Sequence, residues 1–135
     1  MSTIFSKIIS GEIPSYKIAE DGDFYAFLDI QPIAKGHVLV VPKSETDKLF
    51  DLDEYYLSRL LVFAKPIAKA IEATIPCKRC GITVIGLEVP HAHMHLVPMQ
   101  SADDVNFTRP KLSCTNEELQ IIRDAIVLQL SHSGW

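Results

Sequence analysis

The sequence is poor in cysteine, in positive charge and in long apolar runs. Its 135 residues include 3 cysteines, an odd number without regular spacing, which is a poor disulfide framework. Its 13 Lys and Arg against 17 Asp and Glu give a net charge of −4, which argues against nucleic acid as partner because that needs clustered cations. No stretch reaches the roughly 18 apolar residues of a membrane span, and the N-terminus lacks a signal-peptide pattern. We therefore expect a cytoplasmic protein that binds neither nucleic acid nor membrane.

The remaining composition, 47% hydrophobic and 22% charged, is typical of one globular domain, so we expect residues 1–135 to form a single unit. Cys77 and Cys80 form a lone Cys-x-x-Cys pair. Zinc would need two further ligands, so these residues are either loop thiols, which we favour, or half of a metal site.

Three histidines alternate with small or apolar residues near the middle of the chain: His91, His93 and His95. Alternation with period two predicts a β-strand with all three imidazoles on one face and Ala92, Met94 and Leu96 toward the core. We expect Pro90 and Pro98 to bracket this strand, because proline lacks the N–H that a ladder requires.

Three chemical interpretations of this histidine row are possible. At roughly 3.3 Å per residue, His91 and His95 lie about 13 Å apart, so one ion cannot bind all three, but two of them with a remote ligand could hold zinc. Alternatively, the histidines are buried and structural, although three titratable groups on one strand face are unusual in a core. The third interpretation, which we favour, is a catalytic row that handles an anion and its protons.

The histidine row and three earlier segments resemble the histidine triad (HIT) proteins, whose pattern is His-x-His-x-His followed by two apolar residues. The earlier segments are residues 3–14 (TIFSKIISGEIP), 26–32 (AFLDIQP) and 35–43 (KGHVLVVPK), in the family order. The HIT-like core would span about residues 3–99. Within the family, the chain resembles the Hint-like nucleotide phosphoramidase branch. The resemblance implies an α+β fold, with an antiparallel sheet of about five strands packed against a long helix, and a homodimer.

The resemblance also implies a mechanism and the residues that perform it. His93 would attack the α-phosphorus of a nucleotide and form a nucleotidyl-histidine intermediate, which water then hydrolyses. His95 would donate a proton to the leaving group, while His91 and His37 hold the ring tautomers. Neither a metal nor another cofactor is needed in this scheme.

The same resemblance places a purine nucleotide or nucleotide conjugate in a pocket beside the histidines. Asp29 would accept hydrogen bonds from the ribose hydroxyls, and the other expected lining residues are Ile4, Phe5, Ile8, Phe27, Ile30, Leu39, Glu88 and Val89. From the residues alone, we would favour the plainer interpretation, in which the apolar members are core and Asp29 caps a turn.

The loop before the histidine row departs from the family pattern. Many relatives carry an Asn and a Gly-Gln pair there and an Arg after the row, whereas this chain has a short 85–88 segment with Leu87 in place of the Gln, and Met99 in place of the Arg. We expect phosphate binding to rely more on backbone N–H groups and histidines. Glu88 would repel extra phosphates and favour monophosphate derivatives with small or uncharged leaving groups, unless its carboxylate turns to solvent.

Apolar periodicity and turn residues predict the secondary structure around these motifs. Glu20 to Asp23 should form a hairpin turn, and Pro66 should kink one long helix without dividing it. The C-terminal helix should begin at the capping box of Thr115 and Glu118. The expected helices are 4–9, 52–74 and about 115–130, and the apolar stripe of the second, which includes Leu61, is either core or dimer surface. The expected strands are 16–19, 24–29, 36–42 and 81–85 besides the histidine strand. Residues 101–110 should be a surface loop.

Three classes of function remain open at this point. The protein is a hydrolase or transferase of purine nucleoside phosphoramidates or related nucleotide derivatives, a nucleotide-binding regulatory protein with vestigial turnover, or a zinc-binding protein that uses the histidine row. The first is our principal prediction.

Overall fold

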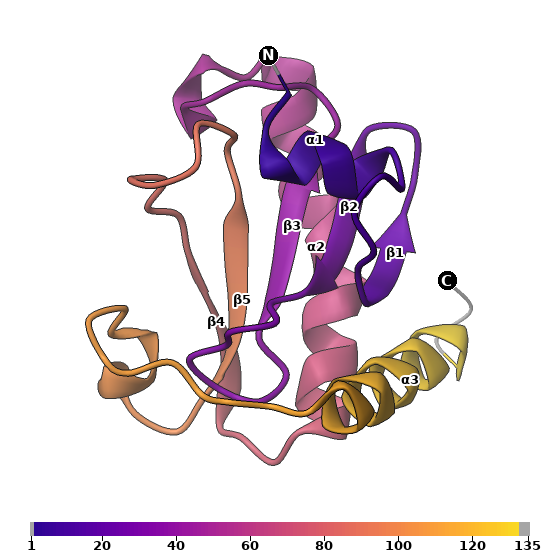
Figure 1. Ribbon diagram of the computed structural model, residues 1–135, viewed down its shortest axis with the longest axis vertical. Coiled ribbons are helices and arrows are strands. Elements are labelled where there is room, and N and C mark those ends of the chain that lie inside the picture. The colour runs from indigo at the N-terminus through magenta and orange to yellow at the C-terminus, as the bar shows by residue number, and fades with distance from the viewer. Residues whose placement is uncertain (1, 133–135) are drawn as a thin grey trace.

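The computed structural model describes residues 2–132 and forms one five-stranded sheet in the order β1-β2-β3-β5-β4, with antiparallel neighbours throughout (Figure 1). The expected α+β fold is confirmed. The strands are β1 (Lys17–Glu20), β2 (Phe24–Leu28), β3 (Val38–Pro42), β4 (Arg79–Thr83) and β5 (Met94–Met99). The helices are α1 (Ile4–Ile9), α2 (Glu54–Thr74) and α3 (Asn116–His132), with short 3-10 turns η1 (Leu49–Asp51) and η2 (Ala102–Val105).

The long helix α2 covers one face of the sheet, and α1 lies on the other (Figure 1). Asp53 caps α2 by accepting the Tyr55 N–H, and the helix continues through Pro66 without interruption, so one helix is formed as predicted. Its buried side chains pack on those of β2, β3 and β5 to form the main core. Leu61, which the periodicity placed on a stripe that is either core or dimer surface, is 57% exposed and is not part of this core.

β3, at the centre of the sheet, and its neighbour β2 have no solvent-exposed face. All five residues of β3 are buried, as its continuous apolar run predicts for a strand at the centre of a sheet. The hairpin of β1 and β2 also forms as expected, and β2 pairs with β3 along its whole length. This places Phe27 and Leu39 directly opposite each other on the face that carries α1.

The expected histidine strand is only half correct. β5 begins at Met94, so His91 and His93 precede the strand in irregular backbone. The reason is that the Ala92 N–H donates to the Thr46 carbonyl at 2.7 Å, which draws this segment toward a distant loop. Ala92, Met94 and Leu96 are buried as predicted.

The sequence predicted that Pro98 ends the histidine strand. This prediction is wrong, because Pro98 lies within β5. β3 pairs with β5 only as far as Leu96, so beyond that point β5 has one neighbouring strand and tolerates a residue without an N–H.

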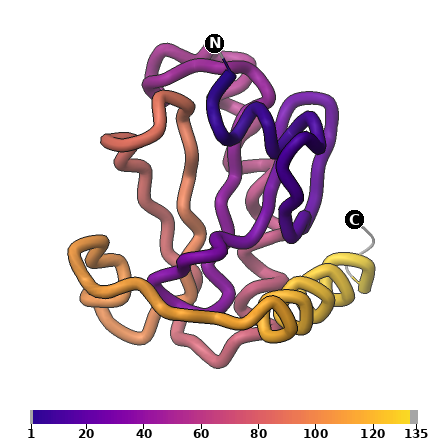
Figure 2. The backbone as a smooth tube through the Cα atoms, in the orientation of Figure 1, coloured from indigo at the N-terminus to yellow at the C-terminus, as the bar shows by residue number. Residues whose placement is uncertain are grey.

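The chain after β5 returns across the molecule before it enters α3. Figures 1 and 2 show the residues between η2 and α3 passing in front of the sheet, near the connection from β2 to β3. The Leu112 N–H donates to the Pro32 carbonyl at 2.8 Å and fixes this approach. The capping box is present, because Thr115 and Glu118 exchange hydrogen bonds of 3.1 Å at the start of α3.

None of the helices within residues 2–132 combines the length and the apolar character that crossing a bilayer requires.

Candidate functional site

A second apolar cluster lies on the α1 face of the sheet, apart from the main core. Phe5 and Ile8 of α1 pack there on Phe27 and Leu39, and Val89 joins them partly buried. The structure therefore brings together five of the expected pocket residues. Three others lie differently: Ile4 is 50% exposed, Ile30 is 61% exposed, and Glu88 is exposed without a hydrogen bond to any described residue.

His93 lies next to this cluster, with its ring centre 5.0 Å from that of Phe5. Its Nδ1 is 2.8 Å from the backbone carbonyl of His91. A carbonyl oxygen only accepts, so Nδ1 carries the proton and donates it to this bond. In the neutral ring, Nε2 is then left with a free lone pair, which is the form that a nucleophile requires.

His37 and His95 form a buried pair beside His93. His37 Nε2 and His95 Nδ1 are 2.9 Å apart, and the Ile33 N–H donates to His37 Nδ1 at 3.3 Å. Because His37 Nδ1 accepts, the proton of the neutral ring lies on Nε2 and is donated to His95 Nδ1. The His95 ring in turn carries its proton on Nε2, so the chain of bonds fixes both tautomers.

The surroundings hold both members of the pair in the neutral form. Burial is the main cause that lowers the pKa of His37, to about 3, and the positive charges of His95, Lys111 and His93 lower it further. Burial, followed by the charges of His93 and Lys111, lowers the pKa of His95 to about 4. At neutral pH neither ring of the free protein is charged.

His91 is completely buried and does not line the open side of the site. Its Nε2–H donates to the Pro42 carbonyl at 2.7 Å, and its Nδ1 lies 2.7 Å from Thr3 Oγ1. Thr3 and Ser6 are themselves held by Glu45, whose pKa is lowered by hydrogen bonds from Ser6 Oγ and the Thr3 N–H. The His91 ring thus fastens α1 to the end of β3, and its carbonyl, rather than its ring, contacts His93.

Asp29 follows β2 and faces the histidine pair. One carboxylate oxygen accepts the Gln31 N–H at 2.9 Å, so Asp29 does hold a turn, and the other oxygen lies 3.8 Å from His37 Nδ1. Burial raises the pKa of this carboxyl, opposed by the Gln31 bond and by Lys111 and His93. The second oxygen remains available to accept hydrogen bonds from a ligand.

Within residues 2–132, the only converging group of three or more His, Cys, Asp or Glu is Asp29, His37 and His95, whose nearest ligand atoms all lie within 4.8 Å of one another. This group fits a metal poorly. The His37 Nδ1 lone pair faces the Ile33 N–H, and its Nε2 is used by His95, so an ion would have to displace existing hydrogen bonds.

The cysteine pair is also a poor zinc site. Cys77 and Cys80 are free, and burial, aided by the Glu72 charge, raises the pKa of both thiols, that of Cys80 to about 12. Zinc binds the thiolate, which this environment disfavours, and no third ligand from the described residues joins the two sulfurs.

The sequence analysis missed two residues at the site: Phe107, which it assigned to the 101–110 surface loop, and Lys111, to which it gave no role. The Phe107 ring centre lies 4.5 Å from that of His95 and 6.0 Å from that of His37. Lys111 lies close enough for its charge to act on Asp29, His37 and His95. No local pattern marks either residue, because both reach the site through the long return of the chain toward α3.

The comparisons with known proteins identify the family of the chain. The HIT domain family matches residues 10–102. Adenosine 5'-monophosphoramidase HNT1 of Saccharomyces cerevisiae is 44% identical over 96 residues, which are 70% of this chain but only 61% of that protein. Adenosine 5'-monophosphoramidase hnt1 of Schizosaccharomyces pombe is 33% identical over 129 residues, 93% of this chain and 96% of that protein.

A solved structure supports the same assignment across nearly the whole chain. The crystal structure of a Hit-like protein involved in cell-cycle regulation from Bartonella henselae superposes with a TM-score of 0.82 at 29% identity, covering 95% of this chain and 96% of that one. The motif resemblance, the family match and the shared fold lead to one assignment: this chain belongs to the HIT family.

Proposed function

We propose that this protein hydrolyses or transfers nucleotides at the α-phosphate of purine nucleoside phosphoramidates or related derivatives. The observation that carries the proposal is the bond from His93 Nδ1–H to the His91 carbonyl, which directs the lone pair of the neutral ring to Nε2. The two relatives named adenosine 5'-monophosphoramidase support this choice of substrate class.

In the first step, His93 Nε2 attacks the α-phosphorus and forms a P–N bond, while the bond from phosphorus to the leaving nitrogen or oxygen breaks. The leaving atom needs a proton, and we assign its delivery to His95. Burial keeps His95 neutral in the free protein, but an anionic phosphate beside it favours the protonated ring. The proton is therefore taken up as the substrate binds, and it leaves with the amine or alcohol.

In the second step, water attacks the nucleotidyl phosphorus, and the P–N bond to His93 breaks. The water contributes its oxygen to the nucleoside monophosphate, one of its protons is taken by the histidine pair, and the His93 lone pair is restored. The roles of His37 and His91 are positional, since His37 donates to His95 and the His91 backbone holds His93.

We assign the nucleoside to the cleft beside α1. Phe5, Ile8, Phe27 and Leu39 offer an apolar floor for a purine, and we assign the exposed Ile4 and Ile30 to its rim. The free oxygen of Asp29 then accepts from the ribose hydroxyls.

We further propose that the protein is a homodimer. β4 is an edge strand that pairs with β5 alone, and exposed apolar side chains accompany it at Ile82 and Ile85. The neighbouring helix α2 exposes Leu61 and Val62 in the same way. A two-fold axis beside β4 would pair this edge with its own copy and cover these side chains. Sedimentation velocity should give a dimer that Val62→Glu weakens; a wild-type monomer at micromolar concentration would rule this out.

The test of the proposed activity is incubation with adenosine 5'-phosphoramidate in the presence of EDTA, with AMP release followed by chromatography. We expect turnover that EDTA leaves unchanged and that His93→Ala abolishes. AMP binding without turnover would favour the nucleotide-binding regulatory protein, and loss of turnover in EDTA with zinc in the purified protein would favour the metal site.

A further inference from the structure

The segment between η2 and α3 lies outside the matched HIT domain, yet it contacts the histidine pair. It is firmly attached at both ends. Arg109 donates to the Asp103 carbonyl at 2.9 Å and pairs with Asp104 at 3.2 Å, and the Leu112 N–H bonds to Pro32. Phe107 and Lys111 are thus presented to the site by an anchored strap, which we define as residues 106–112.

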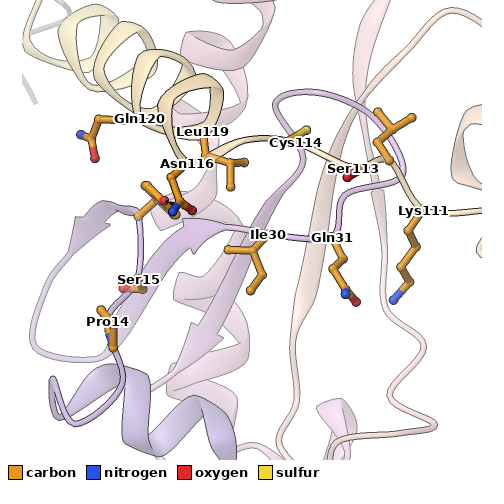
Figure 3. Close-up of a pocket in the computed structure, with 12 residues that line it drawn as sticks. Pro14, Ser15, Ile30, Gln31, Lys111, Ser113, Cys114, Asn116, Leu119 and Gln120 are labelled. Atoms are coloured by element: carbon orange, nitrogen blue, oxygen red, sulfur yellow. Dashed lines mark hydrogen bonds between the residues drawn. The ribbon is translucent and has the colours of Figure 1, made fainter.

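Lys111 is the positive charge of this strap that no carboxylate of the described residues neutralises. It is exposed and forms no hydrogen bond or ion pair with any residue in the described part of the chain, whereas Arg109 is paired with Asp103 and Asp104, and nearby Lys35 is paired with Glu118. Figure 3 shows the Lys111 side chain running alongside that of Gln31, toward the same side as Ile30. These three residues line one hollow of about 910 Å³, which shares Ile30 with the expected nucleoside pocket and is not lined by the histidines themselves.

The site otherwise has little positive charge for an anionic ligand. His37 and His95 are neutral, and Asp29 adds a carboxylate beside them. The polar residues expected before the triad and the Arg expected after it are replaced by Leu87 and Met99. The positions around the histidine row where relatives carry polar or cationic side chains therefore supply no cation here, and Lys111 can supply one.

We propose that Lys111 is a substrate-binding residue: its ammonium, presented by the 106–112 strap, binds the anionic phosphate of the nucleotide and selects charged nucleotides over uncharged nucleosides. This assignment rests on the proposed function, because it places the nucleotide in the same cleft. It extends the site beyond the HIT domain into the C-terminal strap. Phe107, packed on His95, keeps water from the side of the histidine pair that the strap covers.

The experiment compares the binding of AMP and adenosine by isothermal titration calorimetry. Lys111→Met removes the charge and keeps most of the side-chain length, Lys111→Arg keeps the charge, and Lys69→Met is the control, since Lys69 is exposed on α2, on the far side of the sheet. We expect Lys111→Met to weaken AMP about tenfold, and to flatten its salt dependence, with adenosine unchanged. Lys111→Arg should restore most of the AMP affinity, and Lys69→Met should behave like the wild type.

The outcomes separate this inference from the proposed function. If wild-type protein binds neither ligand, the nucleotide site itself is wrong. If wild type binds AMP but Lys111→Met leaves the ratio of AMP to adenosine affinity unchanged, or weakens both ligands equally, then Lys111 does not bind the phosphate and the inference is overturned.

Discussion

Acid should destabilise this protein more than its surface carboxylates account for, because two buried histidines resist protonation. The folded pKa values of His37 and His95 are about 3 and about 4, against 6.5 for the free side chain. As the pH falls below 6.5, the unfolded chain binds protons at these positions and the folded protein does not, so stability decreases until the folded values are reached. At pH 5, which is 1.5 units below 6.5, each of the two rings lowers the free energy of unfolding by about 2 kcal/mol, and the pair lowers it by about 4 kcal/mol.

The assay is urea unfolding monitored by fluorescence at pH 7.5, 6.5, 5.75 and 5. His37→Gln removes one of the two rings, so its loss of unfolding free energy over this range should be smaller by about 2 kcal/mol, whatever its absolute stability. His132→Gln is the control, because His132 is exposed at the end of α3 and should leave the pH dependence unchanged. A wild-type loss below about 1 kcal/mol, or equal losses in wild type and His37→Gln, would refute the reasoning.

Three further substitutions test the site and the fold. Asp29→Ala should weaken AMP at least tenfold but barely affect nucleotides that lack the ribose hydroxyls, since only AMP loses charge-assisted bonds; equal weakening in titration calorimetry would leave Asp29 a purely structural residue. Glu88→Gln should raise kcat/KM for dinucleoside polyphosphates about fivefold relative to kcat/KM for phosphoramidates. The reason is that an exposed carboxylate about 5 Å from a phosphate repels it by about 1 kcal/mol. No relative gain in steady-state kinetics would mean that the Glu88 side chain points away from the substrate. Gly36→Ala should lower the free energy of unfolding in urea by about 1–3 kcal/mol more than Gly11→Ala does. Both glycines have positive φ, but only a Cβ at Gly36 would lie 2.7 Å from Ile75 Cγ1. Equal losses in the two variants would show that the Ile75 side chain moves aside freely.

The elements that local pattern predicted well are those whose stability is local or whose burial is complete. The capping box of Thr115 and Glu118 satisfies its own N–H groups, so its sequence is sufficient to place the start of α3. The continuous apolar run of β3 predicted a central strand, because only a strand buried on both faces needs no polar side.

The errors arose where distant segments meet. Alternation predicted a strand through His91, but the Thr46 carbonyl captures the Ala92 N–H, and nothing in the spacing of the histidines reports a partner so far away in the sequence. For α2 the periodicity left core and dimer surface open, and it did not distinguish buried Leu60 from exposed Leu61, since a period near 3.6 places the stripe only approximately.

The site shows the same division. The residues alone indicated a catalytic histidine row. The family resemblance added His37 to its hydrogen-bond network, but the direct bond from His37 to His95 was not predicted. The strap residues Phe107 and Lys111 lie beyond the family motifs, in and just after the stretch predicted as a polar loop, and their contacts depend on the return of the chain past Pro32.

The central claim is that His93 Nε2 becomes covalently bound to the nucleotide. Wild-type protein should be mixed rapidly with adenosine 5'-phosphoramidate, denatured at alkaline pH to preserve the P–N bond, and analysed by intact-mass spectrometry and peptide mapping. We predict a transient AMP adduct on the peptide that contains His93, absent from His93→Ala, which should still bind AMP. Turnover without an adduct, an adduct on another residue, or His93→Ala activity within about tenfold of wild type would contradict the account.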